Sequence, residues 1–391
     1  MTSSTQTAAA RTEEAAEPLA EALAKLPRVV DLLAARAEEH DRDGAFPYQG
    51  VEALHEAGLL TLTVGQRHGG AAAGLADTVR VLAELGRGDA SVALLAASTL
   101  LQHAEQARGA GWPAPLYRRL LAESRRGPAL VVALDATEAQ LLARRGPEGW
   151  RLSGRLTGCP GAEALAWLAV RVRTDEAVPR TGTFLVRGES EGLEVDPVWD
   201  QLGMRASACH DLHFTEVAVA PELVLGLRAS GAEAPAGAEL DTAWRDLALA
   251  AVQLGIGRAA RDWLVRFLNQ RTPANLGEPL GTLPSYQAAL GELETALIGA
   301  EETLLGLAGR IDAGDPAAAE RTGPAQLLAT RAVVGAVQAA VELTGGPGLS
   351  RRHPLERHLR DALSGRPHGR APQAVLEAAG RAALARSPRR P

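Results

Sequence analysis

The sequence predicts a mainly α-helical protein with a strand-rich segment in its middle. In residues 18–127, and again in residues 241–391, apolar residues recur at spacings of three and four, the period of an amphipathic helix. Residues 128–228 instead carry short apolar runs bounded by turn residues, which is typical of β-strands. A chain of 391 residues is also too long for one simple core, so we expect two or three structural units.

The N-terminal part begins with a short segment of different composition. Residues 1–17 are rich in Ser, Thr, Ala and Glu and lack the basic and apolar regions of a signal peptide, so we expect a mobile tail. In residues 18–127 the helical period is clear at Val79 and Leu82, and glycines such as Gly65 and Gly69 separate one helix from the next. We therefore predict an all-helical N-terminal domain over residues 18–127.

The middle segment, residues 128–228, contains four apolar runs that we predict to be strands. These runs are residues 129–133, 167–172, 183–186 and 212–219. In the last run Leu212, Phe214 and Val217 do not alternate perfectly, which predicts a β-bulge or burial on both faces. The sequence therefore predicts a β domain between two helical ones.

A linker and a helical bundle are predicted to follow the strands. Residues 229–240 have the small and polar composition of a linker. The helical segments expected after it are residues 241–270, 284–312, 322–343 and 354–385. These lengths suit a bundle of long helices spanning residues 241–391.

Composition excludes several classes of function. The net charge of −6 and the pI near 5.9 provide no basic field, so we expect no nucleic-acid partner. The two cysteines, Cys159 and Cys209, are far apart, which predicts neither a disulfide framework nor a metal site and favours a cytoplasmic location. No apolar run reaches the roughly 18 residues that a membrane span needs, so we expect no membrane partner.

Four short strings stand in an order that carries more information than any one of them. They are Gln201–Leu202–Gly203–Met204–Arg205–Ala206–Ser207 with Phe214, Val217 and Val219 downstream; Arg271 with Gly277, Pro279, Leu280 and Gln287; Thr344–Gly345–Gly346–Pro347–Gly348; and Arg360–Asp361–Ala362. In this order and spacing they resemble the acyl-CoA dehydrogenase superfamily, and the resemblance covers roughly residues 45–385. It implies a helical N-terminal domain, a β-barrel middle domain and a C-terminal four-helix bundle.

The resemblance also implies a flavin cofactor, FAD, with FMN as an alternative. A flavin pyrophosphate needs positive charge and close backbone N–H groups, which an arginine fork and a glycine turn supply. The residues that the resemblance assigns to the cofactor are Arg271, Gln287, Gly345, Gly346, Gln373, Thr157 and Ser207. Arg271 and Gln287 would reach the flavin across a subunit interface, which implies a homodimer or homotetramer. The alternative for Arg271 is a cap at a helix C-terminus.

The chain departs from the resembled family at the catalytic base. The glutamate of the dehydrogenases, which abstracts the α-proton of an acyl thioester, corresponds to Gly369, and glycine cannot take a proton. Some family members carry the base on a neighbouring helix, a position that the spacing assigns to Asp246, although an exposed carboxylate in a helix's first turn is the plainer interpretation. His368 matches a histidine of the flavin monooxygenases that share the fold, and it is a candidate acid or base. Its alternative is a loop histidine with no chemical role.

Three functions therefore stay open. The breadth of the resemblance favours a dehydrogenase that acts on an acyl thioester of CoA or a carrier protein and passes electrons to an acceptor. The loss of the glutamate favours a reduced-flavin-dependent monooxygenase, which would need a partner flavin reductase. The third is a non-catalytic scaffold that has lost its flavin. His368 and Asp246 are the candidate catalytic residues for the two enzymatic functions.

Overall fold

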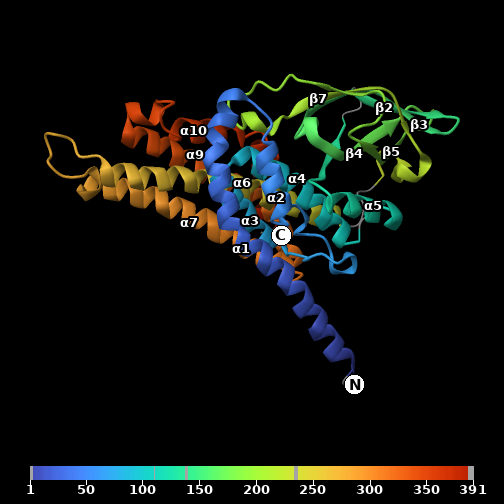
Figure 1. Ribbon diagram of the computed structural model, residues 1–391, viewed down its shortest axis with the longest axis horizontal. Helices are drawn as coiled ribbons and strands as arrows, with labels where there is room; N and C mark the ends of the chain where they lie inside the picture. Colours follow the sequence, from blue (N-terminus) through green and yellow to red (C-terminus); the bar gives the residue numbers. More distant parts are fainter. Residues whose placement is uncertain (1–2, 110, 137–139, 233–236, 386–391) are drawn as a thin grey trace, which may run out of the picture.

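The computed structural model describes residues 3–109, 111–136, 140–232 and 237–385. In chain order it contains a helical part, a β-sheet and a second helical part (Figure 1). The sheet lies at one end of the molecule, and the long C-terminal helices extend away from it toward the other end (Figure 1). This order confirms the helical, strand-rich and helical sequence of segments expected from the apolar periodicity.

The N-terminal part is helical, as predicted. Its helices are α1 (Ser3–Asp43), α2 (Tyr48–Glu56), α3 (Leu75–Gly88), α4 (Ala90–Ala107) and α5 (Ala114–Ser124). Helix α4 is almost wholly buried, and it begins where the Asp89 carboxylate accepts the backbone N–H groups of Ser91, at 2.8 Å, and Val92. Helix α1 starts at Ser3 and so includes most of the segment expected to be a tail; the mobility of that segment stays a prediction.

The central sheet has eight strands and is open. The strands are β1 (Leu130–Asp135), β2 (Leu141–Gly146), β3 (Gly149–Cys159), β4 (Leu165–Thr174), β5 (Arg180–Arg187), β6 (Leu193–Asp196), β7 (His210–Val219) and β8 (Val224–Ala229). Their order is β6-β7-β3-β2-β4-β5-β8, and β1 pairs in parallel with β4. The expected closed barrel is wrong, because among the described residues the short strand β6 pairs only with β7 and β8 pairs only with β5, so the sheet does not close on itself.

The β-bulge expected from the broken alternation is present in β7. Leu152 of β3 lies opposite Val217, whereas Gly154, two residues further along β3, lies opposite Phe214. Strand β7 therefore has one extra residue in this stretch, and Glu216 adopts a φ of 53° there. The bulge lets both Phe214 and Val217 enter the sheet core.

The C-terminal part is helical, but its last predicted helix is two helices. The helices are α6 (Ala238–Gln270), α7 (Pro284–Asp312), α8 (Pro316–Ala319), α9 (Thr322–Thr344), α10 (Leu355–Ser364) and α11 (Pro372–Ala385). The expected single helix over residues 354–385 is broken by the loop of residues 365–371, where Gly365, Pro367 and Gly369 disfavour helix and Pro372 opens the next one. Of the expected linker, residues 233–236 lie outside the described residues.

Helix α6 joins the two helical parts through glycine contacts. A Cβ atom on Gly255 would lie 2.3 Å from the carbonyl oxygen of Ala83, and one on Gly86 would lie 2.5 Å from the carbonyl oxygen of Val252. Only glycine at both positions permits this backbone approach of α3 to α6. The N-terminal half of α6 is thereby held beside α4, which also packs against it.

Helix α9 packs one apolar face into the C-terminal part. Among the described residues it is the one helix long and apolar enough, by length and composition, to cross a membrane. It packs against α6, α7 and α10, and its buried positions include Val333 and Val337. Buried residues make up 39 % of its most apolar stretch, so helix packing accounts for part of its hydropathy.

A buried aspartate ties α10 to the sheet. Asp361 of α10 accepts the backbone N–H of Met204, in the connection between β6 and β7, at 2.6 Å. Burial raises the pKa of Asp361 to about 7. The loop that follows α10 is thereby fixed in position relative to the sheet.

Candidate active site

A cavity of about 540 Å³ lies where the sheet, both helical parts and the loop of residues 365–371 meet. We call it the junction cavity. It is lined by Leu94, Ser98, Leu101 and Gln102 of α4; Val132, Ala133 and Leu134 of β1; Gly158 and Pro160 at the end of β3; Trp199, Gln201 and Cys209 before β7; Arg245 and Leu249 of α6; and Pro367 and His368 of the loop. Its volume and mixed lining are typical of a small-molecule site.

Strand β1 offers backbone hydrogen-bonding groups to the junction cavity. It pairs with β4 along one edge, and on its other edge the N–H of Val131 donates to the hydroxyl of Thr99 at 3.1 Å. Backbone groups of a strand alternate in direction, so Ala133, two residues further on, directs its N–H and C=O to the same side as Val131. Ala133 lines the cavity, and its backbone can therefore pair with the edge of a flat heterocycle.

His368 lines the junction cavity from the loop between α10 and α11. Burial lowers the pKa of its imidazole, so the ring is neutral at pH 7. A neutral imidazole has one nitrogen free to accept a proton. The sequence hypothesis that His368 faces a reacting cavity thus agrees with its position.

Asp246, the second candidate catalytic residue, does not line the junction cavity. It is buried, with 3 % of its surface exposed, and it accepts hydrogen bonds from the hydroxyl of Thr322 at 2.8 Å and from the guanidinium of Arg370. The preceding residue, Arg245, lines the cavity instead. Adjacent residues of a helix point about 100° apart, so an error of one position in the sequence spacing changes which residue is assigned to the cavity. The cavity therefore has the guanidinium of Arg245 where a carboxylate was predicted.

Arg245 is the cation of the junction cavity. In the described part of the chain, its guanidinium has no ion pair or hydrogen bond. The half-buried carboxylate of Glu105 receives a hydrogen bond from the lining residue Gln102 at 3.3 Å. Burial raises the pKa of Glu105, and Arg108 and Arg245 act in the opposite direction. Arg245 is thus available to an anionic group in the cavity.

Trp199 is held in the cavity wall by His210. The backbone N–H of Trp199 donates to Nδ1 of His210 at 3.1 Å, and the indole N–H donates to the carbonyl of Met204 at 3.2 Å. Because Nδ1 of His210 accepts, the ring proton lies on Nε2, which donates to the Glu163 carboxylate at 3.0 Å. His210 therefore acts on the site by positioning Trp199.

No Asp or Glu side chain is among the described residues that line the junction cavity. Its titratable side chains are Arg245, His368 and Cys209. Burial raises the pKa of the Cys209 thiol to about 11, so Cys209 is protonated at neutral pH. Among the described lining residues, His368 is therefore the one titratable side chain that can accept a proton at neutral pH, and its catalytic role stays a prediction.

Three of the predicted cofactor residues lie close to the sheet or the loop but outside the cavity lining. Thr157 is exposed on β3, with its hydroxyl 3.3 Å from the Gln140 amide. Ser207 is fully buried and donates to the carbonyl of Met204 at 2.7 Å. Gln373 is exposed in the first turn of α11 and donates to Glu377 at 2.8 Å.

The other four predicted cofactor residues lie at the far end of the long helices. Arg271 ends α6, Gln287 donates to the carbonyl of Gly281 at 3.0 Å, and Gly345 ends α9 with a φ of 62°, followed by Gly346. About 25 residues of helix separate Arg271 from Arg245, or roughly 38 Å at 1.5 Å per residue. Arg271 therefore cannot reach the junction cavity of its own chain, which is consistent with the contact across subunits that the resemblance implies.

Several lining residues were missed by sequence reasoning. Gly158 and Pro160 line the cavity where Thr157 was expected to contact the cofactor. Gln102 and Arg245 belong to no recognisable sequence motif. The one sequence feature that could have indicated them is a polar residue on an otherwise apolar helix face.

The three-part fold places the junction cavity where the sheet and both helical parts meet, and this fold and chain order can be compared with known proteins. Residues 19–109 match the acyl-CoA dehydrogenase N-terminal domain, and residues 247–371 match the acyl-CoA dehydrogenase C-terminal domain. The chain is 30 % identical over 354 residues to the putative acyl-CoA dehydrogenase YdbM of Bacillus subtilis, covering 87 % of this chain and 91 % of that protein. The chain belongs to the acyl-CoA dehydrogenase family.

Two further proteins are similar over most of this chain. The amino sugar nitrososynthase DnmZ of Streptomyces peucetius is 31 % identical over 354 residues, 87 % of each chain. The solved structure of KijD3 in complex with FMN and a dTDP-linked 3-amino-4-keto sugar has a TM-score of 0.80 at 26 % identity, covering 96 % of this chain and 94 % of that one. The relatives thus include proteins named as acyl-CoA dehydrogenases and one named as an amino sugar nitrososynthase.

Proposed function

We propose that the chain is a reduced-flavin-dependent monooxygenase that acts on a small substrate bearing an anionic group. One observation carries this proposal: within the described residues the junction cavity has no lining carboxylate, whereas it has a neutral imidazole and a free guanidinium. Desaturation of an acyl thioester needs a base strong enough for an α-proton and, in the resembled dehydrogenases, a carboxylate supplies it. Oxygenation of a nucleophilic atom has no such requirement.

The residues present fit a flavin. The backbone of Ala133 would pair with the polar edge of the ring, Gly158 and Pro160 leave room beside it, and Arg271 of a partner subunit would meet the phosphate. When bound in its reduced form, a flavin supplies the two electrons with which one atom of dioxygen passes to the substrate and the other leaves as water. The reduced flavin would come from a partner reductase, and we expect a cytoplasmic homodimer or homotetramer.

The chain's own residues would bind and deprotonate the substrate. Arg245 would hold its anionic group by charge-assisted hydrogen bonds, and His368 would accept the proton that the reacting amine or phenol loses. Trp199 and Leu249 would exclude water from the reacting atoms. The identity to DnmZ and the dTDP-linked ligand of KijD3 support a nucleotide-linked amino sugar as the substrate class.

Acyl-thioester dehydrogenation is the second candidate. It is supported by the identity to YdbM and by the half-buried Glu105, which is hydrogen-bonded to the lining residue Gln102 and whose raised pKa suits a base. In this reaction oxidised flavin meets the substrate, whereas in monooxygenation the reduced flavin meets dioxygen. The two candidates therefore differ in the redox state that supports turnover.

The proposed function is tested by supplying each redox state in turn. We expect the purified chain to bind FAD or FMN, seen as flavin absorption bands, and to convert a nucleotide-linked amino sugar only with reduced flavin and dioxygen. Oxidation of an acyl-CoA with oxidised flavin and an electron acceptor would establish the dehydrogenase instead. Absence of flavin bands at saturating FAD and FMN would leave only the non-catalytic scaffold.

Replacing Arg271 by alanine is expected to weaken flavin binding without unfolding the protein. Loss of a charge-assisted hydrogen bond to phosphate costs about 1.5–3 kcal/mol, so flavin affinity should fall roughly tenfold or more. The measurement is a flavin titration, with light scattering to show that the dimer or tetramer persists. Unchanged affinity and an unchanged Tm would assign Arg271 to capping of α6, and a flavin-binding monomer would refute the shared site.

A further inference from the structure

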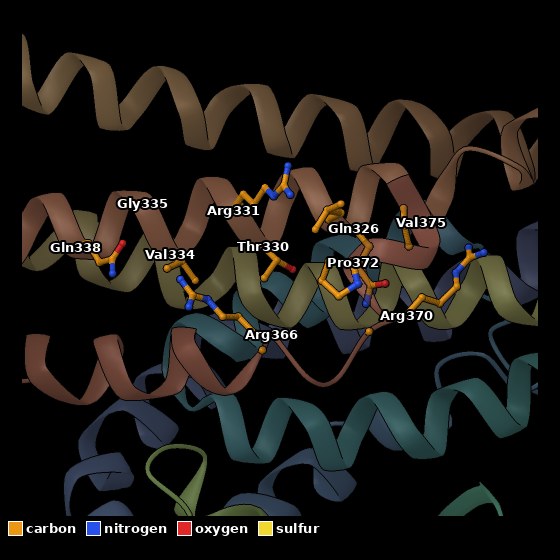
Figure 2. A pocket seen from close by; sticks show the side chains of 14 residues that line it. Gln326, Thr330, Arg331, Val334, Gly335, Gln338, Arg366, Arg370, Pro372 and Val375 are labelled. Carbon is orange, nitrogen blue, oxygen red and sulfur yellow. The ribbon is translucent and has the colours of Figure 1, made fainter. Parts of the chain in front are cut away.

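A second cavity, of about 310 Å³, lies between α9, the loop of residues 365–371 and the start of α11. Figure 2 shows its lining from close by. We call it the arginine cavity, because Arg331 of α9 and Arg366 and Arg370 of the loop all line it. We propose that the arginine cavity binds a phosphorylated small molecule, separately from the flavin and the substrate.

The charge of the arginine cavity is uncompensated. Its lining residues, all of them in the described ranges, include no Asp or Glu. Arg370 is paired with Asp246, but over the part of the chain that the structure describes Arg331 and Arg366 have neither an ion pair nor a side-chain hydrogen bond. In Figure 2 the two free guanidinium groups point in different directions, that of Arg366 toward α9 and that of Arg331 away from the loop. Both side chains are exposed and long, so each can turn toward an anion in the cavity, and their planar forks match phosphate oxygens.

The other lining residues indicate what the ligand carries besides its negative charge. Leu327, Val334 and Val375 provide an apolar surface, and Thr330 and Gln338 add hydrogen-bonding groups on the same stripe of α9 (Figure 2). A ligand that satisfies both features has a phosphate at one end and an apolar, ring-sized body. A nucleoside phosphate has this chemistry and fits a cavity near the lower end of the usual ligand-site range.

Gln326 supplies an independent observation. It is a buried amide, 6 % exposed, that lines the cavity without a hydrogen-bond partner among the described residues. A Cβ atom on Gly369 would lie 2.7 Å from both the nitrogen and the oxygen of this amide, so Gln326 occupies the space beside the loop. A buried polar group needs a partner, and a bound phosphate or base would provide one.

One loop forms the wall between the two cavities. Gly365, Arg366, Gly369 and Arg370 face the arginine cavity, whereas Pro367 and His368 face the junction cavity. The two sites thus have no lining residue in common although they share this segment of chain. A ligand on one side can be distinguished from a ligand on the other by substitutions that touch only one of them.

The test measures binding of ADP, with adenosine and inorganic phosphate as partial probes, by isothermal titration calorimetry on the chain loaded with FMN or with FAD. We expect saturable ADP binding in both loaded forms. Arg366→Ala and Arg331→Ala should each weaken it roughly tenfold or more. Gln338→Glu, which adds a carboxylate to the lining, should weaken it as well.

The matched controls are Arg118→Ala, an exposed arginine on α5, and Arg245→Ala, which removes the guanidinium of the junction cavity. Arg118→Ala should retain wild-type affinity for ADP, Arg245→Ala should retain the ADP binding that Arg366→Ala weakens, and the Tm of every variant reports folding. Three results would each overturn the proposal: no saturable ADP binding, loss of ADP binding in the FAD-loaded chain, or loss in Arg245→Ala with retention in Arg366→Ala. The last two would place ADP in the flavin or substrate site.

Discussion

Replacing His368 by alanine is expected to lower turnover by about 10²- to 10⁴-fold while flavin binding is retained. His368 is the one neutral base among the described residues that line the junction cavity, and Gly369 beside it has no side chain. Removing the imidazole leaves solvent to take the substrate's proton, and the loss falls on the chemical step. The measurement is kcat with reduced flavin and dioxygen, together with a flavin titration.

The pH dependence of the wild type gives a second check on His368. Burial holds the pKa of its imidazole below the ordinary value of about 6.5. The base works in its neutral form, so kcat/KM should be constant near pH 7 and should fall only at pH values below 6.5. His368→Ala should lose this acidic limb.

His213→Ala is the matched control, because His213 lies on β7 outside the junction cavity and is paired with Asp196. It should leave turnover and the acidic limb unchanged. Full activity of His368→Ala, with both reduced and oxidised flavin, would contradict a proton-transfer role for His368. Attention would then move to Glu105, since Asp246 is bound to Arg370 and Thr322.

Replacing Arg245 by alanine is expected to lower kcat/KM for an anionic substrate by roughly tenfold to a hundredfold. Charge-assisted hydrogen bonds are worth about 1.5–3 kcal/mol, and Arg245 is the one guanidinium that the described residues present to the junction cavity. The measurement compares a nucleotide-linked amino sugar with a neutral amine of similar size. The loss should be confined to the anionic compound.

Arg245→Lys separates charge from geometry. It should restore part of the lost kcat/KM, since the ammonium keeps the charge without the planar fork. The flavin affinity should be unchanged in both variants. An equal loss for the charged and neutral compounds would show that Arg245 supports the cavity wall and does not recognise the substrate's anion.

Periodicity predicted most of the helices because their packing faces are apolar stripes, as in α3 and α9. It missed β2, β3, β6 and β8 as separate strands, since these carry polar residues at many positions, such as Arg144 and Arg155. It also joined α10 to α11, because apolar spacing continues on both sides of the loop. The open sheet could not be foreseen, as strand pairing at the edges depends on contacts distant in sequence.

The candidate site was predicted only in part, for reasons of geometry. His368 was found through its place beside Gly369, and it lines the junction cavity. The sequence predicted Asp246 as a cavity residue, whereas the structure has Arg245 there. Counting residues along α6 does not identify the helix face that lines the cavity to within one position. The cavity itself is assembled from α4, β1 and α6, which no single motif connects.

The space beside Gly369 bears on how this protein could change its chemistry. Placing a glutamate at position 369 would put its Cβ 2.7 Å from the Gln326 amide, so that amide would have to move. The amide is the far end of a flexible side chain and Gly369 has no positive φ, so neither a backbone clash nor backbone strain forbids the substitution. A carboxylate at position 369 is therefore one mutational step away, and libraries of single substitutions would already sample a path toward thioester desaturation.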